Sequence, residues 1–368
     1  MSHHFAGIAN FRDLFESSGG IIPPGRIYRC ATPSEATPED VDYLLNTLKV
    51  KTIIDLRTTA ESAADIGQNL LRKHFTVIPE NMLHRTAEIE SMKSSHDRLL
   101  FQIPVIPSNL SFLRELAYTD KAKLAFYGLM GWSEQSNRII GDMMVNLRLE
   151  GLYRLILKTS WKNILRTLDI LSDPSVYPVV IHCTQGKDRT GMIASLIMHI
   201  CQVPEQIISE DYTKSEKELE PMRLDPEYMK RNFARAAPLG LDMTSWMLSP
   251  MEAITTTHEW VKSYFGSYHQ YLEWIGFNVL NQAKLKELLV PKPRVVTDSQ
   301  MSSRNASAAS SIDRSPFLSD QLAGGDDKEY GKKEKKKSGL RFSITFDDEK
   351  KDSHVVIPND ISEPSTST

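Results

Sequence analysis

The stretch IHCTQGKDRTG at residues 181–191 constrains the fold more than any other part of the chain. The apolar run YPVV precedes it, and the apolar run MIASLIMHI follows it. The first run is short and rich in β-branched residues, which is typical of a strand buried on both faces of a parallel sheet. The second run has the spacing of a buried helix face, with Met192, Ile193, Leu196, Ile197 and Ile200. A charged loop therefore connects a buried strand to a buried helix.

This loop has the chemistry of an anion site with a nucleophile beside it. The backbone N–H groups from Thr184 to Arg189 can converge on one point next to a helix N-terminus, which favours a bound anion. The thiol of Cys183 would lose its proton easily in that setting, and a thiolate is a nucleophile. The planar guanidinium of Arg189 matches two phosphate oxygens. The sequence therefore favours nucleophilic displacement at phosphorus.

The string His-Cys-x-x-Gly-Lys-Asp-Arg-Thr-Gly resembles the signature loop of the atypical cysteine-dependent tyrosine and lipid phosphatases. The resemblance covers about the first 290 residues, but extra residues separate NFRDL from the paired glycines, and Cys30 stands where the family usually has serine. Further segments fit the family in order: NFRDL (10–14), GRIYRCATPSEAT (25–37), IIDLRTTAE (53–61), EDYTKS (210–215) and GSYHQYLEWIG (266–276). The resemblance implies hydrolysis of phosphomonoesters through a phosphocysteine, without metal or cofactor. Protein phosphotyrosine, phosphoinositides or both are the implied substrates.

The resemblance also implies a role for each catalytic residue. Cys183 is the expected nucleophile, and Arg189 is expected to hold the phosphate oxygens. No Trp-Pro-Asp tripeptide occurs in the chain, so Asp188 is the candidate proton donor; a salt bridge that shapes the loop is its alternative. Thr190 could stabilise the departing sulfur, or it could cap the helix.

A second set of residues is expected to bind substrate or support the loop. Lys187 would add positive charge at the entrance and favour phosphoinositides, unless it is a surface lysine that points away. His182 would adjust the pKa of the thiol, or it would only pack. The expected substrate-binding residues are Thr184, Gln185, Gly186 and Lys187. Arg12, Asp13, Asp55 and Arg57 are expected to form a supporting charge network near the site.

The overall organisation is predicted as one α/β domain followed by a tail. Residues 1–290 are expected to form a tyrosine-phosphatase-like domain, with a central, largely parallel sheet flanked by helices. A helical insertion over about 84–150 would act as a lid. Residues 291–368 are rich in Ser, Asp and Lys and are predicted to be disordered. Within them, KKEKKKSGLRFSITF is a solvated tail, or else a segment that docks on a partner or a membrane surface.

Composition limits the remaining functions. The chain has 44 Lys and Arg against 47 Asp and Glu, which is not the balance of a nucleic-acid-binding domain. Its 3 cysteines have neither the pattern of a disulfide framework nor CxxC zinc spacing. The first residues lack the apolar run of a signal peptide, and no segment is long enough to span a membrane, so a cytoplasmic protein is expected, with peripheral membrane association left open.

Two other functions remain as alternatives to hydrolysis. One is a non-catalytic scaffold that binds phosphorylated groups, although such relatives usually lose the cysteine or the arginine that this loop keeps. The other is a cysteine sulfurtransferase of the rhodanese type, whose cysteine loop is usually shorter.

Overall fold

The computed structural model describes residues 5–63, 65, 69–107, 109–234 and 236–290. The chain divides into two units, Met1–Lys292 and Pro293–Thr368. The second unit, and with it the predicted disordered tail, lies outside the described residues, so the tail stays a prediction.

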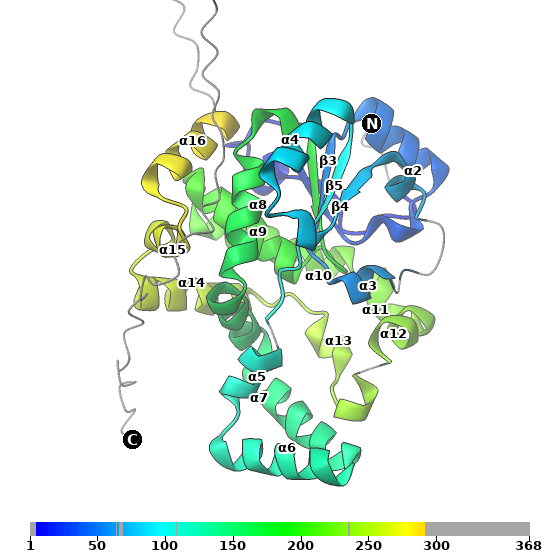
Figure 1. The fold of residues 1–368 in the computed structure, drawn as a ribbon, viewed down its shortest axis with the longest axis vertical. Helices are drawn as coiled ribbons and strands as arrows, with labels where there is room; N and C mark the ends of the chain where they lie inside the picture. Colours follow the sequence, from blue (N-terminus) through cyan, green and yellow to red (C-terminus); the bar gives the residue numbers. More distant parts are fainter. Residues whose placement is uncertain (1–4, 64, 66–68, 108, 235, 291–368) are drawn as a thin grey trace, which may run out of the picture. The chain divides into compact units, whose positions relative to one another are not determined.

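A six-stranded sheet forms the centre of the first unit, in the order β1-β2-β6-β3-β5-β4. Only β1 is antiparallel to its neighbour; the other four pairings are parallel. The predicted central, largely parallel sheet is therefore confirmed (Figure 1). The strands are β1 (Arg12–Asp13), β2 (Ile27–Cys30), β3 (Thr52–Asp55), β4 (Thr76–Ile78), β5 (Leu99–Gln102) and β6 (Val179–His182).

The helices flank this sheet (Figure 1). In chain order, the α-helices that the structure describes are α1 (Leu14–Ser17), α2 (Pro38–Asp42), α3 (Thr59–Ala63), α4 (Thr86–Ser95), α5 (Asn109–Glu115), α6 (Tyr118–Met130), α7 (Ser133–Thr159), α8 (Trp161–Leu171), α9 (Asp188–Ile200), α10 (Glu205–Glu218), α11 (Glu220–Leu224), α12 (Pro226–Phe233), α13 (Met243–Trp246), α14 (Met251–Phe265), α15 (Tyr268–Trp274) and α16 (Val279–Leu289). None of the helices described is both long enough and apolar enough to cross a lipid bilayer.

Alternation along the strands gives the sheet two buried faces. Ile54, Phe101 and Ile181 belong to the larger core, which the helices α8, α9 and α14 to α16 complete. Their neighbours Ile53 and Leu100 belong to a second core, which contains side chains of α2 and of the π-helical turn after it. Because successive side chains of a strand point to opposite faces, a continuous apolar run is buried on both sides.

The strand register aligns the carboxyl ends of β2, β6 and β3 at one edge of the sheet. Cys30 pairs with His182 across β2 and β6, and Asp55 pairs with His182 across β3 and β6. The residues that follow these strands therefore meet at one edge of the sheet. Cys183 lies at this edge, directly after β6.

The predicted insertion over 84–150 is wrong in its first part. Leu99–Gln102 is the fully buried strand β5, and Ile89 of α4 packs in the main core. Its three apolar residues, Leu99, Leu100 and Phe101, form a run too short to be distinguished from a helix segment by periodicity, so the sequence gives little sign of this strand. The helical part after β5 consists of α5, α6 and the start of α7, and α7 is interrupted at Arg148, where φ is 54° and ψ is −175°.

A histidine pair, buried His258 and partly buried His199, packs where α9, α14 and α15 meet. The His199 ring stacks on Tyr268 with ring centroids 3.6 Å apart, and the Tyr268 hydroxyl lies 2.6 Å from His258 Nδ1. Burial, with a smaller contribution from His258, lowers the pKa of His199 from 6.5 to about 2. Burial also lowers the pKa of His258 from 6.5 to about 4. Both rings are therefore neutral in the folded protein at physiological pH.

This pair makes the fold sensitive to acid. Above pH 6.5 both rings are neutral in the folded and unfolded states and contribute no pH dependence. As the pH falls below that value, the unfolded chain binds protons that the folded chain cannot, and stability drops by about 1.4 kcal/mol per pH unit for each ring. We expect His199→Phe, which keeps the stack on Tyr268, to flatten the slope of unfolding free energy between pH 6.5 and 4. The exposed His96→Phe is the control; equal slopes in both variants would contradict the assignment.

Candidate active site

Hydrogen bonds to three successive carbonyls shape the loop between β6 and α9. Backbone N–H of Thr32 donates to the Thr184 carbonyl at 3.0 Å, and Asn10 Nδ2 donates to the Gln185 carbonyl at 2.9 Å. Arg29 donates to the Gly186 carbonyl at 2.7 Å. In a trans peptide the N–H points opposite to the carbonyl, so the N–H groups of residues 185–187 point toward the inner side of the loop. These amides form the concave nest that an anion needs.

Gly186 is required for this shape. Its φ is +66°, and a Cβ there would lie 2.2 Å from the Cys30 carbonyl oxygen. Any other residue would be strained in this conformation and would push the loop away from β2. The glycine therefore holds the loop against the end of the neighbouring strand.

A buried charge cluster supports the outer side of the loop. Asp211 of α10 accepts from Arg29 at 2.7 Å and from Arg12 at 2.8 Å, and at most 6% of each side chain is exposed. Burial and the neighbouring Arg12 lower the pKa of Arg29 to about 10, while Asp211 opposes this shift. Although burial opposes its charge, the two guanidinium groups lower the pKa of Asp211 to about 2. Arg29 is thus held where it can bind the Gly186 carbonyl.

Arg189 lies in the first turn of α9 and holds a carboxylate of the chain itself. Its guanidinium donates to Glu61 of α3 at 2.7 and 2.8 Å, and to the Thr184 hydroxyl at 3.2 Å. Burial opposes the charge of Arg189, but Cys183 and Glu61 outweigh it and raise the pKa of the guanidinium. Although burial acts in the opposite direction, Arg189 lowers the pKa of Glu61 to about 2. The Glu61 carboxylate therefore fixes the orientation of the Arg189 guanidinium, which the sequence analysis expects to bind phosphate oxygens.

Asp188 lies beside Arg189 and receives two hydrogen-bond donors. The Tyr153 hydroxyl of α7 donates to its carboxylate at 2.5 Å, and Lys187 Nζ lies 3.3 Å from the same oxygen. Burial and the charge of Asp188 raise the pKa of Tyr153 well above 10, so this hydroxyl keeps its proton. The side chain of Asp188 is 21% exposed, which leaves it access to solvent. Both sequence interpretations of this residue, proton donor and salt-bridge partner, remain compatible with these contacts.

Lys187 does not lie where it was predicted. Its side chain is fully buried, and its Nζ donates to the backbone carbonyls of Trp246 and Leu248 at 2.6 and 2.7 Å. An ammonium has three donors, and two carbonyls and a carboxylate satisfy them here. The lysine therefore attaches the loop to residues 246–248, and it offers no exposed charge to a second phosphate.

Thr190 and His182 are both buried next to the loop. The Thr190 hydroxyl makes no hydrogen bond within the part of the chain that the structure describes, and the N-cap position of α9 is Lys187, whose side chain makes no capping bond there. His182 Nδ1 lies 3.2 Å from the Cys183 carbonyl, and its Nε2 lies 3.9 Å from Asp55. Burial lowers the pKa of His182, so this ring is neutral.

The predicted network of Arg12, Asp13, Asp55 and Arg57 is wrong as a single cluster. Asp55 pairs with Arg57 at 2.9 Å, and Arg57 also binds Asp65 at 2.7 Å. Arg12 belongs to the Asp211 cluster instead. Asp13 caps α1 and accepts from the Gly25 N–H at 2.7 Å. The four residues therefore belong to three separate places: the Asp211 cluster, the Asp55–Arg57 pair and the start of α1.

The sequence analysis gave no role to Arg29, Glu61 or Tyr153. Arg29 and Glu61 lie inside the segments GRIYRCATPSEAT and IIDLRTTAE, so the resemblance pointed at their neighbourhood without assigning them. Glu61 forms reciprocal bonds with Thr58, which is a capping signal that the sequence carries. Tyr153 reaches Asp188 from 35 residues away, and no local pattern could have shown this contact.

An α/β sheet whose central strand runs into an amide nest with an adjoining cysteine and arginine is the arrangement of a phosphatase. Comparison with known protein families places the chain more narrowly: the sequence model of the tyrosine phosphatase family matches residues 3–291. The chain therefore belongs to the tyrosine phosphatase family.

Two further comparisons add little to this assignment. One solved structure that matches is the core catalytic domain of the PP-IP phosphatase SIW14 from S. cerevisiae, in complex with citrate. It is 16% identical in sequence, with a TM-score of 0.26, and the match covers 60% of this chain and 91% of that one. A search of curated proteins finds no match.

Proposed function

We propose that this phosphatase hydrolyses phosphomonoesters through a phosphocysteine at Cys183, on protein phosphotyrosine, phosphoinositides or both. The single observation that carries the proposal is the inward direction of the loop amides of residues 185–187 next to Cys183 and Arg189. An anion held by these amides would have its phosphorus facing the sulfur. Amides and a guanidinium held in advance stabilise the charge of the transition state without reorganisation.

The reaction proceeds in two displacements. In the first, the Cys183 thiolate attacks phosphorus, the bond from phosphorus to the leaving oxygen breaks, and Asp188 gives that oxygen a proton. In the second, Asp188 takes a proton from water, the water oxygen attacks phosphorus, and the thiolate leaves. The Thr190 hydroxyl, which has no hydrogen-bond partner among the described residues, is available to stabilise the departing sulfur.

Glu61 acts as a positioning residue in this scheme. It holds both terminal nitrogens of Arg189, so a phosphate must take over part of this interaction when it binds. The same carboxylate prevents the guanidinium from rotating away while the loop is empty. Bidentate pairs of this kind add geometric precision as well as energy.

The substrate is tested by phosphate release from an aryl phosphate in the presence of EDTA, followed by a panel of phosphopeptides and phosphoinositides. We expect turnover of the aryl phosphate in EDTA and of at least one class in the panel. Tight binding of these substrates without phosphate release would instead support the scaffold function. Because Lys187 is buried, a preference for phosphoinositides would have to come from other residues.

The acid–base role of Asp188 has its own test. We expect Asp188→Asn to slow the hydrolysis of alkyl phosphates far more than that of nitrophenyl phosphate, because a good leaving group needs little protonation. The expected loss for the poor leaving group is about 10²- to 10⁴-fold. Tyr153→Phe is the companion variant, since it removes the hydroxyl that donates to this carboxylate. Equal losses across leaving groups would mean that Asp188 only shapes the loop.

A further inference from the structure

The helices after β5 form an arm whose end exposes apolar side chains. We define the arm as residues 109–147, which comprise α5, α6 and the part of α7 before the break at Arg148. No residue of the 13-residue helix α6 is buried. Its end and the following turn, LAFYGLMGWS at 124–133, contain no charged residue. We call these ten residues the tip of the arm.

Side chains at the tip face solvent. Leu129 is 84% exposed, and Phe126, Met130 and Trp132 are each about half exposed. A Cβ built on either Gly128 or Gly131 would meet nothing within 4 Å, so no other part of the described chain packs on this turn. An exposed group of large apolar side chains in one place is a mark of a binding surface.

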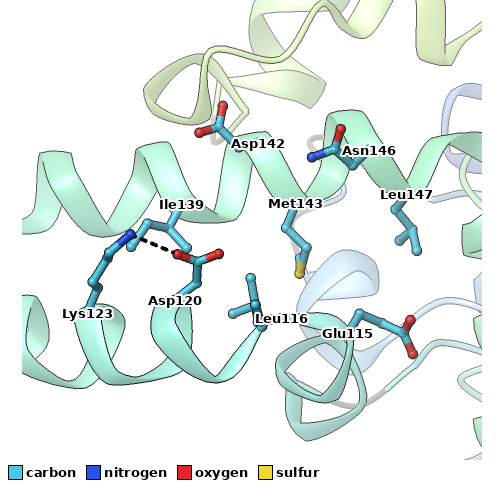
Figure 2. A pocket seen from close by; sticks show the side chains of 10 residues that line it. Glu115, Leu116, Asp120, Lys123, Ile139, Asp142, Met143, Asn146 and Leu147 are labelled. Atoms are coloured by element: carbon cyan, nitrogen blue, oxygen red, sulfur yellow. Dashed lines mark hydrogen bonds and ion pairs between the residues drawn. The ribbon is translucent and has the colours of Figure 1, made fainter.

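The inner face of α6 borders a cavity. A cavity of about 460 Å³ lies beside α6, and both apolar side chains, such as Leu116, Ile139 and Met143, and polar ones, such as Asp120, line it (Figure 2). Figure 2 also shows Lys123 turned toward Asp120, with which it forms an ion pair at 3.2 Å. A helix of this length is marginal by itself, and its apolar side chains are mostly on the outside. The exposed apolar side chains of α6 are therefore available to a partner outside the described chain.

The arm starts from the edge of the sheet that carries the catalytic loop. It follows the carboxyl end of β5, and β5 is parallel to β3, which is parallel to β6. Figure 1 shows α6 at the bottom of the view, away from the strands. Beyond the break at Arg148, α7 continues to Tyr153, which bonds Asp188 in the loop. A surface bound at the tip would thus lie on the side of the molecule to which the loop opens.

We propose that the tip inserts into the boundary between the headgroups and acyl chains of a lipid bilayer, so that the loop acts on phosphorylated headgroups of that surface. Docking of the tip on a bilayer does not depend on the proposed function, whereas its use for catalysis rests on that function. Phe, Tyr and Trp combined with Leu and Met are typical of side chains at membrane interfaces. A projecting turn without any charge suits a bilayer, whereas a protein interface usually has a polar rim around its apolar centre.

The charges behind the tip are nearly balanced. Between residues 118 and 138 there are three basic residues, Lys121, Lys123 and Arg138, against Asp120 and Glu134. Both acids are in ion pairs, with Lys123 and Arg138, while Lys121 donates to the Arg114 carbonyl. Over the whole arm four basic residues stand against four acidic ones, so insertion of the apolar tip, and not electrostatic attraction, supplies the proposed binding.

Co-sedimentation of the full chain with phosphatidylcholine vesicles containing phosphatidylserine tests the proposal. We expect the wild-type chain to bind, and Leu129→Glu to weaken the partition by at least about tenfold, because a leucine in the acyl region is replaced by a charge. The matched control is Leu280→Glu in α16, since Leu280 is 78% exposed and lies outside the arm. Cys183→Ser should bind vesicles like the wild type, which separates docking from catalysis.

Activity measurements on the same variants test whether docking serves the hydrolysis of membrane-bound substrates. Leu129→Glu should hydrolyse a soluble aryl phosphate at the wild-type rate and lose activity only toward a phosphoinositide embedded in vesicles. If the wild-type chain ignores vesicles, or if Leu129→Glu and Leu280→Glu bind them equally, the proposal is wrong. If sedimentation shows instead that the wild type is a dimer that Leu129→Glu dissociates, the tip is an interface between two copies, and the bilayer is excluded as its partner.

Discussion

Cys183→Ser should remove turnover, with a loss of at least about 10³-fold in kcat, while the variant still binds substrate. A serine hydroxyl at this position has no accessible anion at neutral pH and cannot attack phosphorus. The loop amides and Arg189 remain in place, because Arg29, Asn10 and Thr32 hold the loop from the outside. Phosphate release from an aryl phosphate and calorimetric binding of a phosphopeptide measure the two quantities.

Cys201→Ser is the matched control for this variant. Cys201 is also buried, but it lies at the far end of α9, after the last residue of the helix. We expect it to retain turnover, so that a loss of activity specific to residue 183 reflects the chemistry and not the packing of a serine. A Cys183→Ser chain that turned over substrate near the wild-type rate would end the phosphocysteine mechanism.

Asp211→Asn should destabilise the folded chain by about 3–5 kcal/mol, because it leaves two buried guanidinium groups without a countercharge. A domain is typically stable by only about 5–15 kcal/mol, so the loss should be large in a denaturant titration. Activity should fall as well, since Arg29 would no longer be held against the Gly186 carbonyl.

Glu35→Gln removes an ion pair of the same length and serves as the control. Arg231 lies 2.7 Å from Glu35, but the two side chains are 40% and 60% exposed. Exposed pairs typically contribute about 0–1 kcal/mol, so this variant should unfold almost like the wild type. If the two variants lose similar stability, the Asp211 cluster is not the buried support that its contacts indicate.

The part of the fold around Cys183 is predictable from sequence because its signals are local. A β-branched apolar run, a charged loop and a helical apolar face follow one another within 177–200, and each specifies its own element. The predicted strand before the loop is β6, and the predicted helix after the loop is α9. Strand β5 was missed because a short buried run has no period that distinguishes strand from helix.

The supporting residues of the site were not predictable in the same way. Arg12 and Asp13 are adjacent, yet one binds Asp211 across the sheet edge and the other caps a helix. Lys187 lies in the loop, yet it is buried and bonds residues 246 and 248. Such contacts depend on which distant segments pack together, and no spacing within the loop encodes them. The family resemblance identified the residues of the loop, whereas only the structure shows which distant residues bind them.

The most direct test of the account is to trap the covalent intermediate. The wild-type chain, mixed with a phosphorylated substrate and quenched in acid, should yield a peptide containing Cys183 that is heavier by one phosphoryl group. The amount should rise in Asp188→Asn with an activated aryl phosphate, because the second step then lacks its base. Phosphate found on another residue, or full turnover with no label on Cys183 at any time, would contradict the phosphocysteine mechanism.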